Sequence, residues 1–425
     1  MNQKPTTLRR SITWVQGVAL TIGAVLGSGV LVLPVFAADL AGPASMISWV
    51  LMGLLTIPLV ITLGKLASKC PDAGGIAAYA QLAFGWRAGT VTGWLFLGTV
   101  PIAAPIAALI GANYIGVYLA LSHGQIVFTA AFTLAMTLFF NYRGISLSGK
   151  VQLAIVSVIA LILLAVIAAA LPAVDRQQFT PFAPRGWIPV GEAMTLLFWA
   201  FVGWEMIGHL AEEFEDPARD IQLSLGVSVI IVNSLYLLLA LTIIGTGSYL
   251  GQDKVAALAI MVSQGWGKSA GAVVAALGFA VCYGAIHTYV AGFSRLVYAQ
   301  ARQGAFPAFF SGLHPVFQTP HRVLWSLVPC FSFVLFVIHH FNVNLAAFIQ
   351  FPSAIFIALY IIGMASAIKL LGKSENSRYC AIISFISCVI VYGFTGWAGL
   401  YPIILGTVGW YMGYRKEASL PRAVE

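Results

Sequence analysis

The stretch Val25-Leu26-Gly27-Ser28-Gly29-Val30-Leu31 lies in the middle of the first long apolar segment, which runs from about Ile12 to Ala37. A helix that crosses a bilayer satisfies its own backbone hydrogen bonds, and Gly-Ser-Gly in its middle favours a break. Free N–H and C=O groups at membrane depth are tolerated only where they line a cavity or bind a ligand. The half-helix after the break points its positive N-terminal end at the gap, which suits a carboxylate. The alternative is that these small residues only allow close helix packing.

The composition is that of a membrane protein. Of the 425 residues, 60% are hydrophobic and only 8% are charged, and the mean hydropathy is +0.92. A soluble core could not bury so much apolar sequence, so we predict an all-α polytopic protein with the lipid bilayer as a partner. The net charge of +8 is spread over short loops, so we expect no nucleic-acid partner.

Hydropathy divides the chain into twelve apolar spans within one transmembrane domain, residues 1–425. The spans cover approximately residues 12–37, 44–66, 89–120, 125–141, 150–171, 189–211, 222–246, 269–300, 322–340, 343–370, 379–394 and 397–414. We expect spans one to five (about 12–171) and six to ten (about 189–370) to form two halves, followed by two additional helices (379–414). Short helices are expected at Ile76–Phe84 and within residues 252–264.

The basic residues indicate the orientation of these spans. With both termini in the cytoplasm, 18 of the 22 Lys and Arg residues fall in inner segments and 4 in outer segments. The outer four are Arg176, Arg185, Lys254 and Lys268. Because positive charge concentrates on the cytoplasmic side, we expect a multi-pass protein with cytoplasmic N- and C-termini.

Span six contains a second candidate break at Phe201-Val202-Gly203-Trp204-Glu205. Its glycine is again at mid-membrane, flanked by aromatic residues. Glu205 lies well inside an apolar run, and an ionisable residue there marks a functional site by default. The alternative is a structural Glu205, protonated or hydrogen-bonded to nearby backbone. Interrupted segments at equivalent positions of two halves predict a five-plus-five inverted-repeat transporter with a central site.

With these motifs the chain resembles the amino acid–polyamine–organocation transporter superfamily. The matching pieces, in order, are Gly27–Leu31 with Pro34, Pro71–Gly75 with Tyr79, Phe201–Glu205, Glu213–Asp220 and Ala301–Pro307. Within that superfamily it most resembles the bacterial exporters of methionine and branched-chain amino acids, through Thr92–Leu97, Phe198-Trp199, His209-Leu210 and Glu213-Phe214. The resemblance implies a bacterial cytoplasmic membrane.

The resemblance also implies a central site with substrate-binding residues Val25, Gly27, Ser28, Gly29, Trp199, Phe201, Val202 and Gly203. In that site, the backbone N–H groups of Gly27, Ser28 and Gly29 would meet the substrate carboxylate, with help from the Ser28 hydroxyl.

The ammonium group of the substrate would meet backbone carbonyls near Val25, Trp199 and Val202. Trp199 and Phe201 are candidates for an aromatic wall or gate, with helix packing as the alternative for both. One departure from the family concerns span five, where some relatives carry a lysine in place of a sodium ion. Here Val151–Ala170 carries no charge, which puts lysine-based coupling in doubt.

We expect Glu205 to carry the coupling proton and His209 to tune it, because such a pair would titrate as a unit. If the helix continues past the break, both would share a face with Asp216. The alternative is that Glu205 and His209 only brace spans six and one.

The chain shows no set of catalytic residues, no metal-ligand cluster and no nucleotide-binding motif, so we expect no enzyme, no metal and no cofactor. We expect a secondary transporter of neutral, apolar amino acids that exports methionine, leucine, isoleucine and valine, with proton antiport. A proton-coupled uptake permease is the alternative, since sequence does not separate the directions. A non-transporting amino-acid sensor is the alternative from a different class. The sequence does not predict an oligomeric state.

Overall fold

The computed structural model describes residues 12–70, 75–144, 149–209, 214–302, 304–341, 343–373 and 376–419. The helices, in chain order, are α1 Trp14–Val25, α2 Leu33–Ala41, α3 Ser45–Lys69, α4 Ile76–Phe84, α5 Trp86–Leu97, α6 Val100–Leu119, α7 His123–Tyr142, α8 Gly149–Ala170, α9 Ile188–Leu197, α10 Met206–His209, α11 Pro217–Gly245, α12 Ala257–Trp266, α13 Lys268–Arg302, α14 His321–Phe341, α15 Leu345–Leu370, α16 Asn376–Tyr392 and α17 Leu400–Ser419. Within these ranges there is no β-strand, and the one β-bridge joins Ile12 to Phe214.

Eight continuous stretches of the described chain are long and apolar enough to cross a membrane. Four shorter apolar helices, α1, α9, α12 and α16, add to them, with α9 extended to Phe201. Two of the eight stretches, Leu33–Lys69 and Trp86–Leu119, join neighbouring helices. The prediction of an all-helical, multi-span membrane protein is confirmed, whereas the count of twelve spans and the inverted repeat stay predictions.

Both predicted helix breaks are present. The α1 helix ends at Val25, Gly27 is extended (φ −91°, ψ −173°), and a short 3₁₀ helix, η1 (Ser28–Leu31), leads into α2. The second break begins with a 3₁₀ helix, η5 (Phe198–Phe201), after α9. It continues through extended Val202 to Gly203, whose φ of +117° few other residues adopt.

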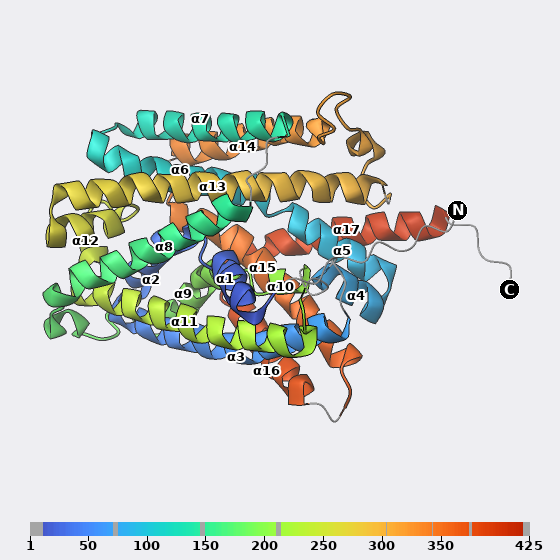
Figure 1. The fold of residues 1–425 in the computed structure, drawn as a ribbon, viewed down its shortest axis with the longest axis horizontal. Helices are drawn as coiled ribbons and strands as arrows, with labels where there is room; N and C mark the ends of the chain where they lie inside the picture. Colours follow the sequence, from blue (N-terminus) through green and yellow to red (C-terminus); the bar gives the residue numbers. More distant parts are fainter. Residues whose placement is uncertain are drawn as a thin grey trace.

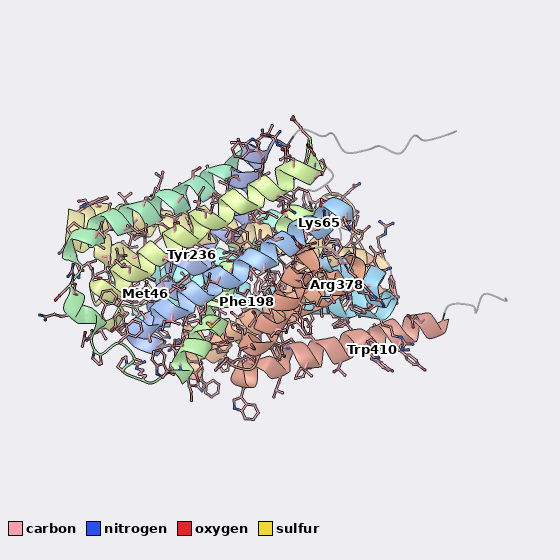
Figure 2. The ribbon with its side chains drawn as sticks, turned by 90° about the horizontal axis from the view of Figure 1, so that it is seen from below. Met46, Lys65, Phe198, Tyr236, Arg378 and Trp410 are labelled. Carbon is pink, nitrogen blue, oxygen red and sulfur yellow. The ribbon has the colours of Figure 1, made fainter. Side chains whose placement is uncertain are left out.

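The broken helices lie inside the bundle (Figure 1). In that view α7 and α14 form one edge and α3 and α16 the other, with α1, α9, α10 and α15 between them. Figure 2 shows Tyr236 of α11 and Phe198 of η5 between Met46 and Lys65, which mark opposite ends of α3. The second break therefore lies part-way along the bundle, at the depth where a membrane-embedded site is expected.

The connecting segments agree with the sequence in part. The predicted short helix Ile76–Phe84 is α4, with the same bounds. The helix expected within residues 252–264 is α12, which begins later, at Ala257. The shared face of Glu205 and Asp216 required the helix to continue past the break as far as Asp216, and it does not. Asp216 is the N-cap of α11, where its carboxylate accepts the Arg219 N–H at 3.3 Å.

The second break lies against the first at Gly203. A Cβ atom on Gly203 would lie 2.5 Å from the carbonyl oxygen of Ala24 and 3.0 Å from the nitrogen of Val25. Backbone atoms of α1 therefore occupy the space that any other side chain would need. Only glycine at position 203 permits this contact.

We predict that Gly203→Ala destabilises the fold, because the positive φ alone costs an alanine about 1–3 kcal/mol and the Ala24 contact adds to it. The measurement is the thermal unfolding midpoint of the purified protein, which should fall. Gly226→Ala is the matched control, since a Cβ at Gly226 meets no atom within 4 Å. An unchanged midpoint for Gly203→Ala would contradict this account of the break.

Candidate functional site

A small cavity lies between the two helix breaks. Six of the residues predicted to bind substrate line it: Val25, Gly27, Ser28, Gly29, Trp199 and Val202. The remaining lining residues are Ala24, Val30, Ala200 and Tyr289, the last from α13. An added Cβ on Gly29 would lie 3.6 Å from Cδ1 of Trp199, so the first break directly faces this indole ring. The structure thus brings residues that are about 170 positions apart in sequence to one point.

The first break offers two free donors to this cavity. Ser28 and Gly29 begin the 3₁₀ helix η1, where the first N–H groups have no partner within the helix. Neither N–H has a hydrogen-bond acceptor among the described residues. The N–H of Gly27 differs from the expectation, because it donates to the carbonyl of Val25 at 2.8 Å. A bound carboxylate would therefore meet Ser28 and Gly29 rather than all three.

Some carbonyl groups at the breaks already accept a hydrogen bond, and others are free. Tyr236 on α11 donates its hydroxyl to Ala200 at 2.8 Å and lies 3.4 Å from the oxygen of Val25. Tyr236 therefore ties the two breaks together, and the Val25 carbonyl is already occupied. Across the described chain, no donor reaches the carbonyls of Trp199 and Val202. These two remain the acceptors for a substrate ammonium.

Two predicted substrate residues, Phe201 and Gly203, do not line the cavity. The Phe201 ring is buried and packs against Trp49 and Tyr236, with centroid distances of 5.9 and 5.3 Å. This placement matches the packing alternative for Phe201, and the aromatic residues that line the cavity are Trp199 and Tyr289. Gly203 instead allows the second break to pack against the backbone of α1.

Glu205 lies next to the cavity, in the turn before α10, with 7% of its surface exposed. Its Oε2 atom accepts two hydrogen bonds. One comes from the N–H of Gly203 at 3.0 Å, and the other from the hydroxyl of Tyr360 on α15. Glu205 therefore joins the second break to α15. The side chain of His209 lies outside the described residues, so its pairing with Glu205 stays a prediction.

The cavity measures about 10 Å³, which is room for about one water molecule. An amino acid needs several times this volume, so substrate binding requires side chains to move. Trp199 is the candidate, because it is only partly buried whereas its neighbours Phe198 and Ala200 are fully buried. A rotation of this indole would widen the cavity without disturbing either break.

Three tyrosines that are not among the residues predicted from the sequence hold the breaks. Tyr114 on α6 donates its hydroxyl to the carbonyl of Leu31 at 2.9 Å. Tyr236 and Tyr360 act at the second break as described above. Each has a relative exposure of 1% or less. Their sequence signal is a phenol in the middle of an apolar span, whose hydroxyl must find a partner there. In the described chain, no three His, Cys, Asp or Glu side chains gather as metal ligands.

A membrane-spanning helical fold with two interrupted helices is typical of secondary transporters. Sequence comparison identifies the family. A sequence model described as "Amino acid permease" matches residues 12–412, so the chain belongs to this family. It is similar to the uncharacterized amino acid permease YecA of Bacillus subtilis, with 44% identity over 95% of both chains.

A second relative is the L-methionine/branched-chain amino acid exporter YjeH of Escherichia coli, with 31% identity over 94% of both chains. A third is the branched-chain amino acid permease BcaP of B. subtilis, with 26% identity over 75% of this chain and 73% of BcaP.

We predict that Gly27→Val abolishes amino-acid transport while the protein stays folded. Gly27 lines the cavity, has a φ that valine tolerates, and faces no atom within 4 Å of an added Cβ. The valine methyl groups would therefore occupy the substrate's space without disturbing the bundle. Leucine counterflow in proteoliposomes measures transport, and gel filtration checks folding. Gly226→Val, which also faces open space, is the control. Normal counterflow in Gly27→Val would remove this cavity from the substrate path.

Proposed function

We propose that this chain is a secondary transporter that exports methionine, leucine, isoleucine and valine across a bacterial cytoplasmic membrane. The observation that carries the proposal is the cavity between the two breaks. It combines free N–H groups at Ser28 and Gly29 with free carbonyls at Trp199 and Val202. Opposite charges one carbon apart in an amino acid match this pair of donor and acceptor sets.

The lining of the cavity supports apolar substrates. Its described lining residues carry no charged side chain, and they present Ala24, Val30 and the Trp199 indole to a ligand. A substrate with a charged side chain would find no partner for that charge in the cavity. Burial of an unpaired polar group costs about 2–7 kcal/mol, and burial of an unpaired charge costs more. The likeness to YjeH and BcaP supports branched-chain substrates, and the likeness to YjeH supports export.

The orientation of the protein follows from its charges. Arg176, Arg185, Lys254 and Lys268 lie in the segments that we propose face outward, and the other basic residues lie in the segments that face the cytoplasm. In Figure 1, α12 marks the end that we propose is outer, and α4 marks the opposite, cytoplasmic end.

We further propose that Glu205 carries the coupling proton. Its Oε2 atom has two lone pairs, and Gly203 and Tyr360 use both. A proton taken up at either carboxyl oxygen removes the negative charge that strengthens these two hydrogen bonds, which loosens the contact between the second break and α15. Proton binding and the shape of the substrate cavity are thereby linked through the Glu205 carboxyl group.

The direction of transport is tested in cells that are fed dipeptides and either express or lack this chain. We expect expression to lower the internal pools of leucine and methionine released from their dipeptides, and to leave the lysine pool from a lysyl dipeptide unchanged. The Gly27→Val variant is the control for expression of an inactive protein. A higher leucine pool in expressing cells would instead show uptake, and a lower lysine pool would show that the pocket accepts charge.

The coupling role is tested with Glu205→Gln in proteoliposomes. The amide oxygen can still accept from Gly203 and Tyr360, so leucine exchange without a pH gradient should persist. Accumulation driven by a pH gradient should disappear, because the amide takes up no proton. Glu192→Gln, on α9 of the same span, is the matched control. A variant that still concentrates leucine excludes Glu205 as the coupling site, and loss of both activities indicates a bracing role.

A further inference from the structure

A second and larger cavity lies at the α12 end of the bundle. It measures about 260 Å³ and is lined by α2, α6, α7, α14, the start of α15 and the segment that precedes α12. Its lining includes one carboxylate and one ammonium group, Asp39 and Lys254, which form an ion pair with 2.6 Å between Oδ1 and Nζ. Neither the substrate residues nor the coupling carboxylate described above contributes to it.

The ion pair is accessible to water and weakly held. The side chains of Asp39 and Lys254 are 27% and 35% exposed. A pair with this exposure contributes little net free energy, because water and salt screen the attraction. A ligand that brings its own positive and negative groups can therefore replace it at little cost, provided that both charges find a partner.

The remaining lining suits the body of an apolar amino acid. Leu109, Val255 and Leu345 supply apolar surface, and the amide side chains of Asn113 and Asn344 add polar groups to the lining. At the liquid share of about 30 Å³ per water, the cavity has room for about nine waters. Leucine and methionine contain about this number of non-hydrogen atoms, so either fits without further opening.

The α2 helix connects this cavity to the central site. It begins at Leu33, just after the first break, and Asp39 lies six residues further on. At a rise of 1.5 Å per residue, these six residues cover about 9 Å. The end of α2 does not depend on Lys254, because the guanidinium of Arg185 donates to the backbone carbonyls of Asp39 and Leu40. Loss of the Lys254 contact should therefore leave α2 in place.

We propose that this cavity binds a second amino-acid zwitterion, whose carboxylate pairs with Lys254 and whose ammonium pairs with Asp39. The ligand thereby exchanges the protein's own ion pair for two pairs of the same kind. The proposal rests on the proposed function, since the occupant is the amino acid that the central site transports. Under the proposed orientation, this outer site is the last point that an exported molecule contacts before it leaves.

The test is the number of leucine molecules bound per chain, measured by equilibrium dialysis of radiolabelled leucine with the purified full-length protein in nanodiscs. We expect two for the wild type. Lys254→Met, which removes one charge, and Asn113→Phe, which fills the cavity but keeps the ion pair, should each bind one. Gly27→Val should also bind one, at the outer site. Lys268→Met, an exposed lysine at the start of α13 that lies outside the cavity, is the matched control and should bind two.

The outcomes separate this proposal from the proposed function. One leucine on the wild type together with none on Gly27→Val, or two on either cavity variant, overturns the outer site and leaves the central site standing. The absence of any leucine binding to the wild type overturns the proposed function as well. A fall to one in Lys268→Met would show that the loss of any positive charge at this end reduces binding, and would also overturn the proposal.

Discussion

The fold depends on how the backbone groups at the two helix breaks find partners away from water. A continuous helix satisfies these groups itself, and each break exposes several of them at membrane depth. Three buried tyrosines on three different helices, Tyr114, Tyr236 and Tyr360, supply donors at the breaks. Tyr236 serves both breaks, so the two interrupted spans form one unit held by α11. What these partners leave free, chiefly the N–H groups of Ser28 and Gly29, is what a ligand can use.

The same constraint connects the proposed proton carrier to the proposed substrate site. Gly203 touches the backbone of α1, and its N–H is held by Glu205, which also binds α15. A change at the carboxylate therefore reaches the first break through a contact of backbone on backbone. The space beside Gly203 is too small for even a Cβ atom, so the backbone of α1 limits how far Gly203 can move toward it.

The sequence predicted the parts of the molecule that have a local cause. Gly27-Ser28-Gly29 and Gly203 break their helices because a glycine interrupts a long apolar run. The bounds of α4 follow from Gly75 and Gly85, both with positive φ, on either side of Ile76–Phe84. These features need no knowledge of tertiary contacts.

The parts that the sequence did not predict depend on which elements face each other. From the sequence, Phe201 and Trp199 are equal candidates for an aromatic wall of the site. The structure distinguishes them, because Phe201 packs against Trp49 whereas Trp199 lines the cavity. The three tyrosines carry no periodic signal, since their partners lie in other helices. Whether Asp216 shares the helical face of Glu205 depends on where α11 begins, and Asp216 is the N-cap of that helix. The sequence does not show that the Gly27 N–H is occupied, because its hydrogen bond to the Val25 carbonyl depends on the local turn.

The central claim is that the two breaks together form the substrate site. The most direct test is a cryo-EM map of the full-length protein with leucine bound, in nanodiscs. The account predicts density for the leucine carboxylate at the N–H groups of Ser28 and Gly29, with the Trp199 indole displaced from its position beside Gly29. A map in which leucine binds elsewhere, while the cavity between Gly27 and Trp199 stays closed, would contradict it.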